Sequence, residues 1–328
     1  MSTRQSLQNA VLHVTPARFE GLALEVFRWQ AAQNPIYSQF IGYLGINPAR
    51  VSSLAQIPFL PIGLFKSHRI LTQSPEIEAV FESSGTTGVA TSRHHVADLD
   101  WYRRVSIRLF EDVYGPLSHY HILGLLPSYL ERNNSSLVYM VQHFIEQSRS
   151  PFSGFFLHHT DELLKILRNL VENTDERKVI LWGVTFALLD LAESGRDLAF
   201  LQNTHSLIIM ETGGMKGRRR EMLREEVHET LTTALGVAAI HSEYGMTEML
   251  SQAYSQGDGI FETSATMRVL LRDINDPRTV FANAQNAPRY GGINVADLAN
   301  LDSCAFIETQ DLGRFVEGNH HRFEVIGR

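Results

Sequence analysis

Three apolar runs alternate with two helical segments in the middle of the chain, and this alternation constrains the fold more than any other feature. The apolar run at residues 178–183 leads into an apolar helical segment at 186–192. A second apolar run at 207–210 precedes a charged helical segment from about 219 to 234, and a third run follows at 237–240. Strands that alternate with helices of this length predict the α/β class with a mostly parallel, doubly wound sheet.

The regions before and after this α/β segment have other secondary-structure patterns. Residues 19–32 predict a helix in an N-terminal region that prolines interrupt, and 161–171 carry the apolar stripe of an amphipathic helix. Short strand-like runs at 267–271 and 304–308 predict a β-rich C-terminal part. Four residues of the charged segment are spaced four apart and predict one buried helix face: Leu223, Val227, Leu231 and Leu235.

Charge and cysteine content narrow the class of partner. The net charge of -7 gives no basic field for a nucleic-acid backbone, so we expect no nucleic-acid partner. The chain has one cysteine, Cys304, which is typical of a reducing compartment, and we expect a cytoplasmic protein. No apolar stretch is long enough to predict a transmembrane segment.

A run of hydroxyls and glycines at residues 83–88, with the sequence SSGTTG, is the first polar motif. Glycines allow successive backbone N–H groups to face one concavity, and the hydroxyls add donors, so the run suits a polyphosphate. No glycine in the chain is followed by lysine, which excludes a P-loop. A solvent-exposed polar turn is the alternative on composition.

The second motif, HSEYGMTE at residues 241–248, follows directly after the predicted strand at 237–240. Ligands of open α/β sheets bind at the carboxyl ends of strands. Tyr244 can stack on a purine, Thr247 can donate to a phosphate, and Glu248 can hold Mg2+. The alternative is a turn at Tyr244 followed by a helix that opens with Thr247 and Glu248.

The third motif, ETQDLGR at residues 308–314, predicts a strand that ends in an acidic turn. Asp311 offers two carboxylate oxygens that match the hydroxyls of a ribose diol. A plain β-turn that contains Asp and Gly is the alternative.

In this order, the three motifs resemble the core motifs of the adenylate-forming superfamily, which includes acyl- and aryl-CoA ligases, peptide-synthetase adenylation domains and luciferases. Three further segments, ETGGMKGR at 211–218, RVLLRD at 268–273 and DLAN at 297–300, make the chain similar to the acyl-protein synthetase (LuxE) branch, with phenylacetate-CoA ligases as cousins. The likeness runs from about residue 59 to the last residue.

The resemblance implies ATP and Mg2+ as cofactors and the large-domain fold of the superfamily. It also implies a role for each matching position. The β- and γ-phosphates would lie against Ser83, Ser84, Gly85, Thr86, Thr87 and Gly88. Adenine would lie against Gly213, Gly214 and Tyr244, the α-phosphate against Thr247, Mg2+ against Glu248, the ribose against Asp311 and Arg328, and the acyl group against Trp182 and Gly183.

The residue patterns and the resemblance together predict three regions. We expect a helical N-terminal segment at 1–80 packed on the main domain, an α/β core for nucleotide and acyl group at 81–262, and a β-rich subdomain at 263–328. The last residues resemble the start of the family's hinge, so we expect the small C-terminal lobe to be absent.

Two positions depart from the family's pattern. Many relatives follow the phosphate loop with Pro-Lys, whereas Arg93 is the nearest cation here. LuxE-type proteins also carry an acceptor cysteine near the C-terminus, but Cys304 lies before Asp311 in a run that predicts a buried strand. We therefore expect Cys304 to be structural and the acyl acceptor to be missing or external.

The resulting hypothesis is activation of a carboxylic acid, a fatty acid by the resemblance, as acyl-adenylate, followed by transfer to a protein thiol. The partner would then be an acyl-accepting protein, such as a reductase or carrier. One alternative keeps adenylation and makes CoA or a carrier protein the acceptor. The other is a non-catalytic nucleotide-binding scaffold subunit.

Overall fold

The computed structural model describes residues 3–84, 91–128, 130–172, 176–203, 206–213, 220, 222–316 and 318–327 of the chain. Its α-helices are α1 (Thr3–Leu12), α2 (Phe19–Gln33), α3 (Pro35–Tyr43), α4 (Leu99–Tyr114), α5 (Ser136–Ser148), α6 (Thr160–Glu172), α7 (Thr185–Ala192) and α8 (Arg224–Leu235). Short 3-10 turns lie between them, among them η4 (Ile62–Lys66).

The strands that carry most of the fold form one long sheet with the order β12-β11-β13-β14-β15-β10-β9-β8-β7-β6-β4-β5, to which β1 adds by pairing with β14, while β2 and β3 form a separate pair. Their bounds are β1 (Leu60–Pro61), β2 (Ala79–Glu82), β3 (Arg93–Val96), β4 (Tyr120–Leu125), β5 (Gly154–Phe155), β6 (Lys178–Val184), β7 (Leu207–Thr212), β8 (Ile240–Tyr244), β9 (Ala253–Ser255), β10 (Ile260–Glu262), β11 (Met267–Arg272), β12 (Val280–Phe281), β13 (Gly291–Asp297), β14 (Phe306–Val316) and β15 (Asn319–Gly327).

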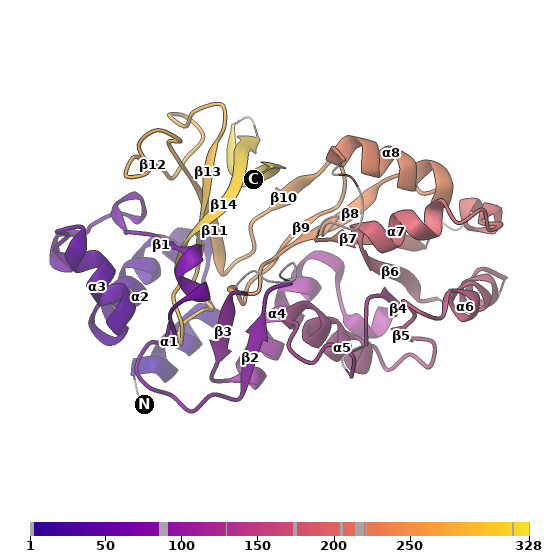
Figure 1. Cartoon of the computed structure of the whole chain (residues 1–328), viewed down its shortest axis with the longest axis horizontal. Coiled ribbons are helices and arrows are strands. Elements are labelled where there is room, and N and C mark those ends of the chain that lie inside the picture. Colours follow the sequence, from indigo (N-terminus) through magenta and orange to yellow (C-terminus); the bar gives the residue numbers. More distant parts are fainter. Residues whose placement is uncertain are drawn as a thin grey trace.

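Parallel pairing is concentrated at one end of the sheet. Strands β5, β4, β6, β7 and β8 pair in parallel, and α4 to α8 surround them at the right of Figure 1. Every residue of β4 is buried, and so is every residue of β6 after Lys178, as expected for strands covered on both faces. This region confirms the α/β class and the helices and strands predicted at 161–171, 178–183, 186–192 and 207–210.

Antiparallel pairing dominates the other end, where β9 to β15 form the β-rich C-terminal part that was predicted. Helices α1 to α3 lie beside it at the left of Figure 1. The aromatic rings of Phe27 and Tyr37 lie 6.1 and 6.4 Å from that of Phe306 at the start of β14. The N-terminal helices, including the predicted one at 19–32, are therefore fixed to the antiparallel end of the sheet by an aromatic core.

Two strand predictions are wrong in their bounds. Residues 237–239 are not a strand, because Gly236 ends α8 in the left-handed conformation and pairing with β7 begins only where Ile240 faces Ile209. Asp311 does not lie in a turn, because β14 is paired on both sides, with β13 and β15, and runs through it. Gly313 serves close packing there, since a Cβ would lie 2.6 Å from the Glu324 carbonyl oxygen.

Two smaller expectations are also corrected. Leu223 precedes the first turn of α8 and is 67% exposed, so only Val227, Leu231 and Leu235 form the buried face. Cys304 is fully buried, as expected, but it lies before β14 and not within a strand. None of the helices in the described ranges is long and apolar enough to cross a bilayer.

Candidate functional site

A cavity of about 920 Å³ lies where the carboxyl ends of β7 and β8 face β14 and the segment that follows β2. Seven of the residues predicted from the motifs line it, although they come from distant parts of the chain: Ser83, Ser84, Gly213, Tyr244, Thr247, Glu248 and Asp311. The other predicted nucleotide-binding residues lie outside the described ranges: Gly85, Thr86, Thr87, Gly88, Gly214 and Arg328.

The base of the predicted phosphate loop is closed by two hydrogen bonds. The Ser83 backbone N–H donates to the Ser92 carbonyl at 3.0 Å, and the Ser92 N–H donates to the Ser83 hydroxyl at 3.0 Å. Both serines line the cavity, and so does Ser84. Ser83 and Ser92 are thus held together at the cavity wall.

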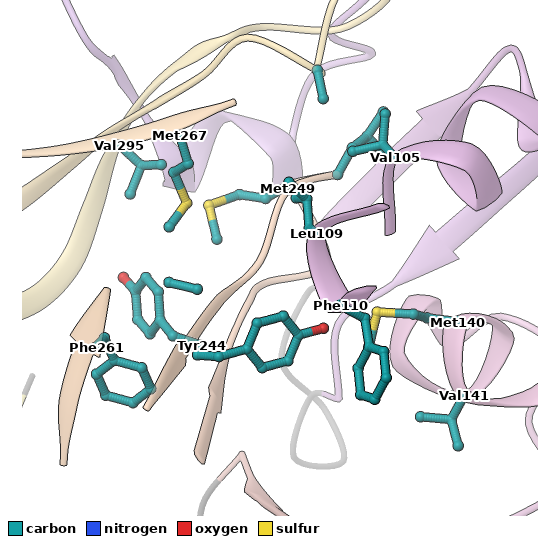
Figure 2. Packing of buried hydrophobic residues seen from close by; sticks show 14 of the residues in the cluster. Val105, Leu109, Phe110, Met140, Val141, Tyr244, Met249, Phe261, Met267 and Val295 are labelled. Carbon is teal, nitrogen blue, oxygen red and sulfur yellow. The ribbon is translucent and has the colours of Figure 1, made fainter. Parts of the chain in front are cut away.

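Tyr244 ends β8 and is fixed on several sides. Its hydroxyl donates to Oδ2 of Asp311 at 3.1 Å, and its ring lies 5.7 Å from that of Phe261 and 5.4 Å from that of Phe323. Figure 2 shows Tyr244 beside Phe261. A ring held in this way can present a preorganised surface to a planar base.

The segment Thr247 to Glu248 is braced through its backbone. Nδ1 of His94 lies 2.8 Å from the Thr247 carbonyl oxygen, and the Asn300 amide donates to the Glu248 carbonyl at 2.7 Å. Burial lowers the pKa of His94 to about 4, so its ring is neutral near pH 7. His94 lies two residues after Ser92, which lines the cavity, and Thr247 lines it too. The contact between His94 and Thr247 therefore connects two segments of the cavity wall.

Asp297 braces the next residues. Its carboxylate accepts from the Leu250 and Ser251 N–H groups at 2.7 and 3.1 Å, from the Ser251 hydroxyl at 2.6 Å and from the Ala299 N–H at 3.1 Å. The DLAN segment that marked the family resemblance therefore holds the chain that follows Tyr244. No sequence pattern indicated this role, because Leu250 and Ser251 lie nearly fifty residues from Asp297.

Two buried glutamates that the motifs did not single out as site residues line the cavity from adjacent strands. Glu211 of β7 accepts from the Thr185 hydroxyl and lies 3.7 Å from the Arg224 guanidinium. Glu243 of β8 accepts from the Thr212 hydroxyl at 2.5 Å. Burial raises the pKa of Glu211 and raises that of Glu243 to about 7, to which the negative charge of Glu211 adds.

The cations that line the cavity do not include Arg93, the cation nearest the phosphate loop in the sequence. Arg93 forms an ion pair with Glu82 across β2 and β3, at 3.1 Å. Lys66, Arg132 and Arg224 line the cavity instead. No motif surrounds them in the sequence, so only their position in the fold could reveal them.

The structure does not bring Trp182 and Gly183 to this cavity. Trp182 is fully buried, with its ring 6.3 Å from that of Phe110 and 5.9 Å from that of Phe144. Gly183 faces Leu188, since a Cβ there would lie 2.7 Å from that side chain. Both residues are buried outside the cavity wall, and their predicted role toward the acyl group stays a prediction.

A family comparison covers most of the chain. The sequence model of the family described as acyl-protein synthetase, LuxE, matches residues 18–328. No curated protein matches the chain.

Solved structures of adenylate-forming ligases share the fold. A 2-hydroxyisobutyryl-CoA ligase in the postadenylation state superimposes with a TM-score of 0.67 at 14% identity, over 95% of this chain and 68% of that one. ATP-bound MatB from Rhodopseudomonas palustris gives 0.55 at 17% identity, over 77% of this chain and 48% of that one. An acyl-CoA synthetase from Brucella canis gives 0.50 at 17% identity, over 78% and 46%. The chain thus spans about half the length of two of these ligases.

Proposed function

The chain belongs to the acyl-protein synthetase (LuxE) family, and from this premise we propose that it uses ATP to activate a carboxylic acid as an acyl-adenylate. The observation that carries the proposal is the convergence on one cavity of the three motifs, through Ser83, Tyr244, Glu248 and Asp311. These residues lie up to 228 positions apart, and no local preference would bring them together. If the three motifs were ordinary polar turns, nothing would require them to meet at one cavity.

Each wall of the cavity has a part in the reaction. The serines at the start of the phosphate loop, with Lys66 and Arg132, bind the triphosphate. Tyr244 stacks on adenine, and Asp311, which accepts a hydrogen bond from Tyr244, binds the ribose hydroxyls. Thr247 donates to the α-phosphate, where charge develops in the transition state.

The chemistry is attack by the substrate carboxylate on the α-phosphorus of ATP, with pyrophosphate as the leaving group. Catalysis then depends on positioning and on neutralising phosphate charge, and no general base is required. The backbone contacts of His94 and Asn300 contribute by holding Thr247 and Glu248 in place.

Magnesium fits the donor set of this site. The Glu248 carboxylate is only 5% exposed and lines the same cavity as the phosphate-loop serines. Carboxylate oxygens together with nucleotide phosphates are the ligands that Mg2+ prefers. Mg2+ held there would neutralise phosphate oxygens as pyrophosphate departs.

The acyl group then passes to a thiol on a partner protein. Cys304, the single cysteine of these 328 residues, is fully buried, and burial raises the pKa of its thiol to about 12. A buried neutral thiol is a poor nucleophile. We therefore place the acceptor thiol outside these residues, on a reductase or carrier partner, with CoA as the alternative acceptor.

Exchange of pyrophosphate into ATP, driven by a panel of fatty and aromatic acids, tests the adenylation step. Activity with at least one acid is expected, and the fatty acids test the substrate class that the family resemblance implies. Binding of ATP without exchange for any acid would favour the alternative of a non-catalytic scaffold. Where exchange occurs, transfer of a labelled acyl group to protein or to CoA distinguishes the two acceptors.

The variant Glu248→Gln tests the assigned metal role. It removes the charge and keeps the shape, so exchange is expected to fall by about a hundredfold or more. Glu172→Gln at the exposed end of α6 is the matched control and should exchange at the rate of the unaltered protein. Near-normal exchange by Glu248→Gln would contradict the role.

A further inference from the structure

The sheet has two faces where β7 and β8 end at the cavity. Residues that pair across these strands share a face, so Glu211 lies with Ser242, and Thr212 lies with Glu243 on the opposite face. Tyr244, two residues after Ser242, belongs to the first face. Because Tyr244 is assigned above to adenine, the nucleotide occupies that face. The face of Thr212 and Glu243, which both line the cavity, is therefore left for the acid.

Helices α4 and α5 cover the face that is left for the acid. Tyr254 of β9 pairs with Glu243 and so shares this face. The ring of Phe110 on α4 lies 6.1 Å from that of Tyr254, and the ring of Phe144 on α5 lies 5.1 Å from that of Phe110. The acid pocket therefore lies between these two helices and the carboxyl ends of β7 and β8.

The first turns of both helices line the cavity, and their later turns do not. Tyr102 lies in the first turn of α4, and α5 contributes Ser136, Leu137 and, in its second turn, Met140. Side chains four positions apart share a helix face, so Phe144 lies one turn below Met140. Phe144 is fully buried and lies outside the cavity wall. Met140 is therefore the deepest residue of α5 at the cavity.

An aromatic layer fills the space beyond Met140. The ring of Trp182 lies 6.3 Å from that of Phe110 and 5.9 Å from that of Phe144. These three side chains are fully buried, and Tyr254 is 3% exposed. Rings packed in this way fill the space between the helices and the sheet. An acyl chain that entered between α4 and α5 would meet Met140 before it met these rings.

Met140 has the properties of an end wall. It lines the cavity and yet is only 2% exposed, as expected for a side chain that closes the narrow end of a pocket. Its unbranched thioether is apolar, and the neighbouring wall carries the Leu137 side chain and the Tyr102 ring. Burial of an alkyl chain against such a surface is favourable.

We propose that the Met140 side chain forms the end wall of the acid pocket and determines the length of the acyl chain that the protein activates. The inference rests on the proposed function and refines it by naming a residue that determines specificity. The substrate carboxylate lies toward the nucleotide, and the methyl end of its chain contacts Met140. Met140 takes no part in the bond changes.

A series of straight-chain saturated acids, from butanoate to hexadecanoate, tests this inference in ATP–pyrophosphate exchange. Met140→Ala removes the side chain beyond Cβ and leaves room for about two or three methylenes. The acid with the highest kcat/KM should become longer, and kcat/KM for that longer acid should rise by about tenfold or more. Met140→Phe fills the end of the pocket, so the best acid should become shorter. An unchanged order of the acids in both variants would overturn the inference and leave adenylation intact.

Val141→Ala is the matched control. Val141 follows Met140 on α5, as Figure 2 shows, and it is fully buried outside the cavity wall. Its truncation loosens the same helix without opening the pocket, so thermal stability should fall while the order of the acids stays that of the unaltered protein. A change of chain length in Val141→Ala equal to that in Met140→Ala would trace the effect to loosened packing and overturn the inference.

A binding measurement separates this inference from the proposed function. Calorimetric titration with the same acids, in the presence of the non-hydrolysable analogue α,β-methylene ATP, needs no turnover. A tightest-binding acid that is longer in Met140→Ala than in the unaltered protein supports the inference even if no acid drives exchange. The same tightest-binding acid in all variants overturns it, and so does a lack of binding by every straight-chain acid.

Discussion

The two sides of the cavity treat their buried polar groups differently. Toward the antiparallel end, the Asp297 carboxylate accepts four hydrogen bonds and Asn300 donates to the Glu248 carbonyl. Toward the parallel end, Glu243 has one hydroxyl donor, and the Oε1 atom of Gln252 has no partner among the described residues. All of these groups are less than 9% exposed, so burial alone does not distinguish them.

This difference separates buried polar groups with several partners from buried polar groups with one or none among the described residues. A buried polar group whose partners are complete stabilises the chain around it, here the segment that carries Thr247 and Glu248. A buried acceptor whose partners are incomplete costs stability in the free protein. Substitutions on the two sides should therefore have opposite effects on stability.

The largest effect is expected from Asp297→Ala. The change removes the acceptor of four buried hydrogen bonds, so the free energy of unfolding should fall by about 3–5 kcal/mol. Urea unfolding measures it. Asp112→Ala on the exposed face of α4 is the matched control and should change the free energy by about 0.5 kcal/mol or less. A loss for Asp297→Ala no larger than that of the control would contradict the structural role.

Glu243→Gln should instead stabilise the free protein. Burial raises the pKa of Glu243 from its usual value near 4.5 to about 7. Between these values the folded protein keeps a proton that the unfolded chain loses, so the free energy of unfolding of the unaltered protein falls as pH rises and stays low above pH 7. Gln does not ionise, so Glu243→Gln does not lose this free energy as pH rises. Its free energy of unfolding should exceed that of the unaltered protein by about 2–3 kcal/mol at pH 8 and by much less near pH 4.

Thermal or urea unfolding at the two pH values checks this prediction. Glu172→Gln, whose side chain is exposed, should show no such pH-dependent difference. If Glu243→Gln proved less stable than the unaltered protein at pH 8, Glu243 would belong with Asp297 as a structural group, and the contrast between the two sides would fail.

Asn300→Ala should have an intermediate effect. It removes the donor to the Glu248 carbonyl and the side chain 3.1 Å from Nε2 of His94, at an expected cost of about 2 kcal/mol. Because it loosens Thr247 and Glu248, kcat for pyrophosphate exchange should fall more than the affinity for ATP. An unchanged kcat at full stability would show that this brace does not position the site.

Cys304→Ser should have the smallest effect. A hydroxyl can keep the contact of Sγ with the Phe306 carbonyl, which is 3.4 Å long, so a loss of about 1 kcal/mol is expected. Exchange of pyrophosphate should be unchanged, because Cys304 lies outside the cavity wall. Loss of exchange in a folded variant would overturn its assignment as a structural residue.

Sequence patterns located the elements whose signals are local. The apolar runs of β6 and β7 and the stripes of α2 and α6 were predicted because side-chain spacing within one element reports its buried face. The patterns placed Asp311 in a turn, because Asp and Gly are common in turns. In the fold β14 continues through it, since strands pair with it on both sides.

By itself, the sequence determined the α/β class, the order of the motifs and seven of the residues that line the cavity. The tertiary structure decided which side of β8 each residue faces, that Asp297 and Asn300 brace the active segment, and that Lys66 and Arg132 reach the cavity. The reason is physical: periodicity arises from neighbours a few residues apart, whereas the hydrogen-bond partners of a buried polar group come from strands and loops far away in the chain. Whether the Glu243 carboxylate has one donor or several depends on those distant partners.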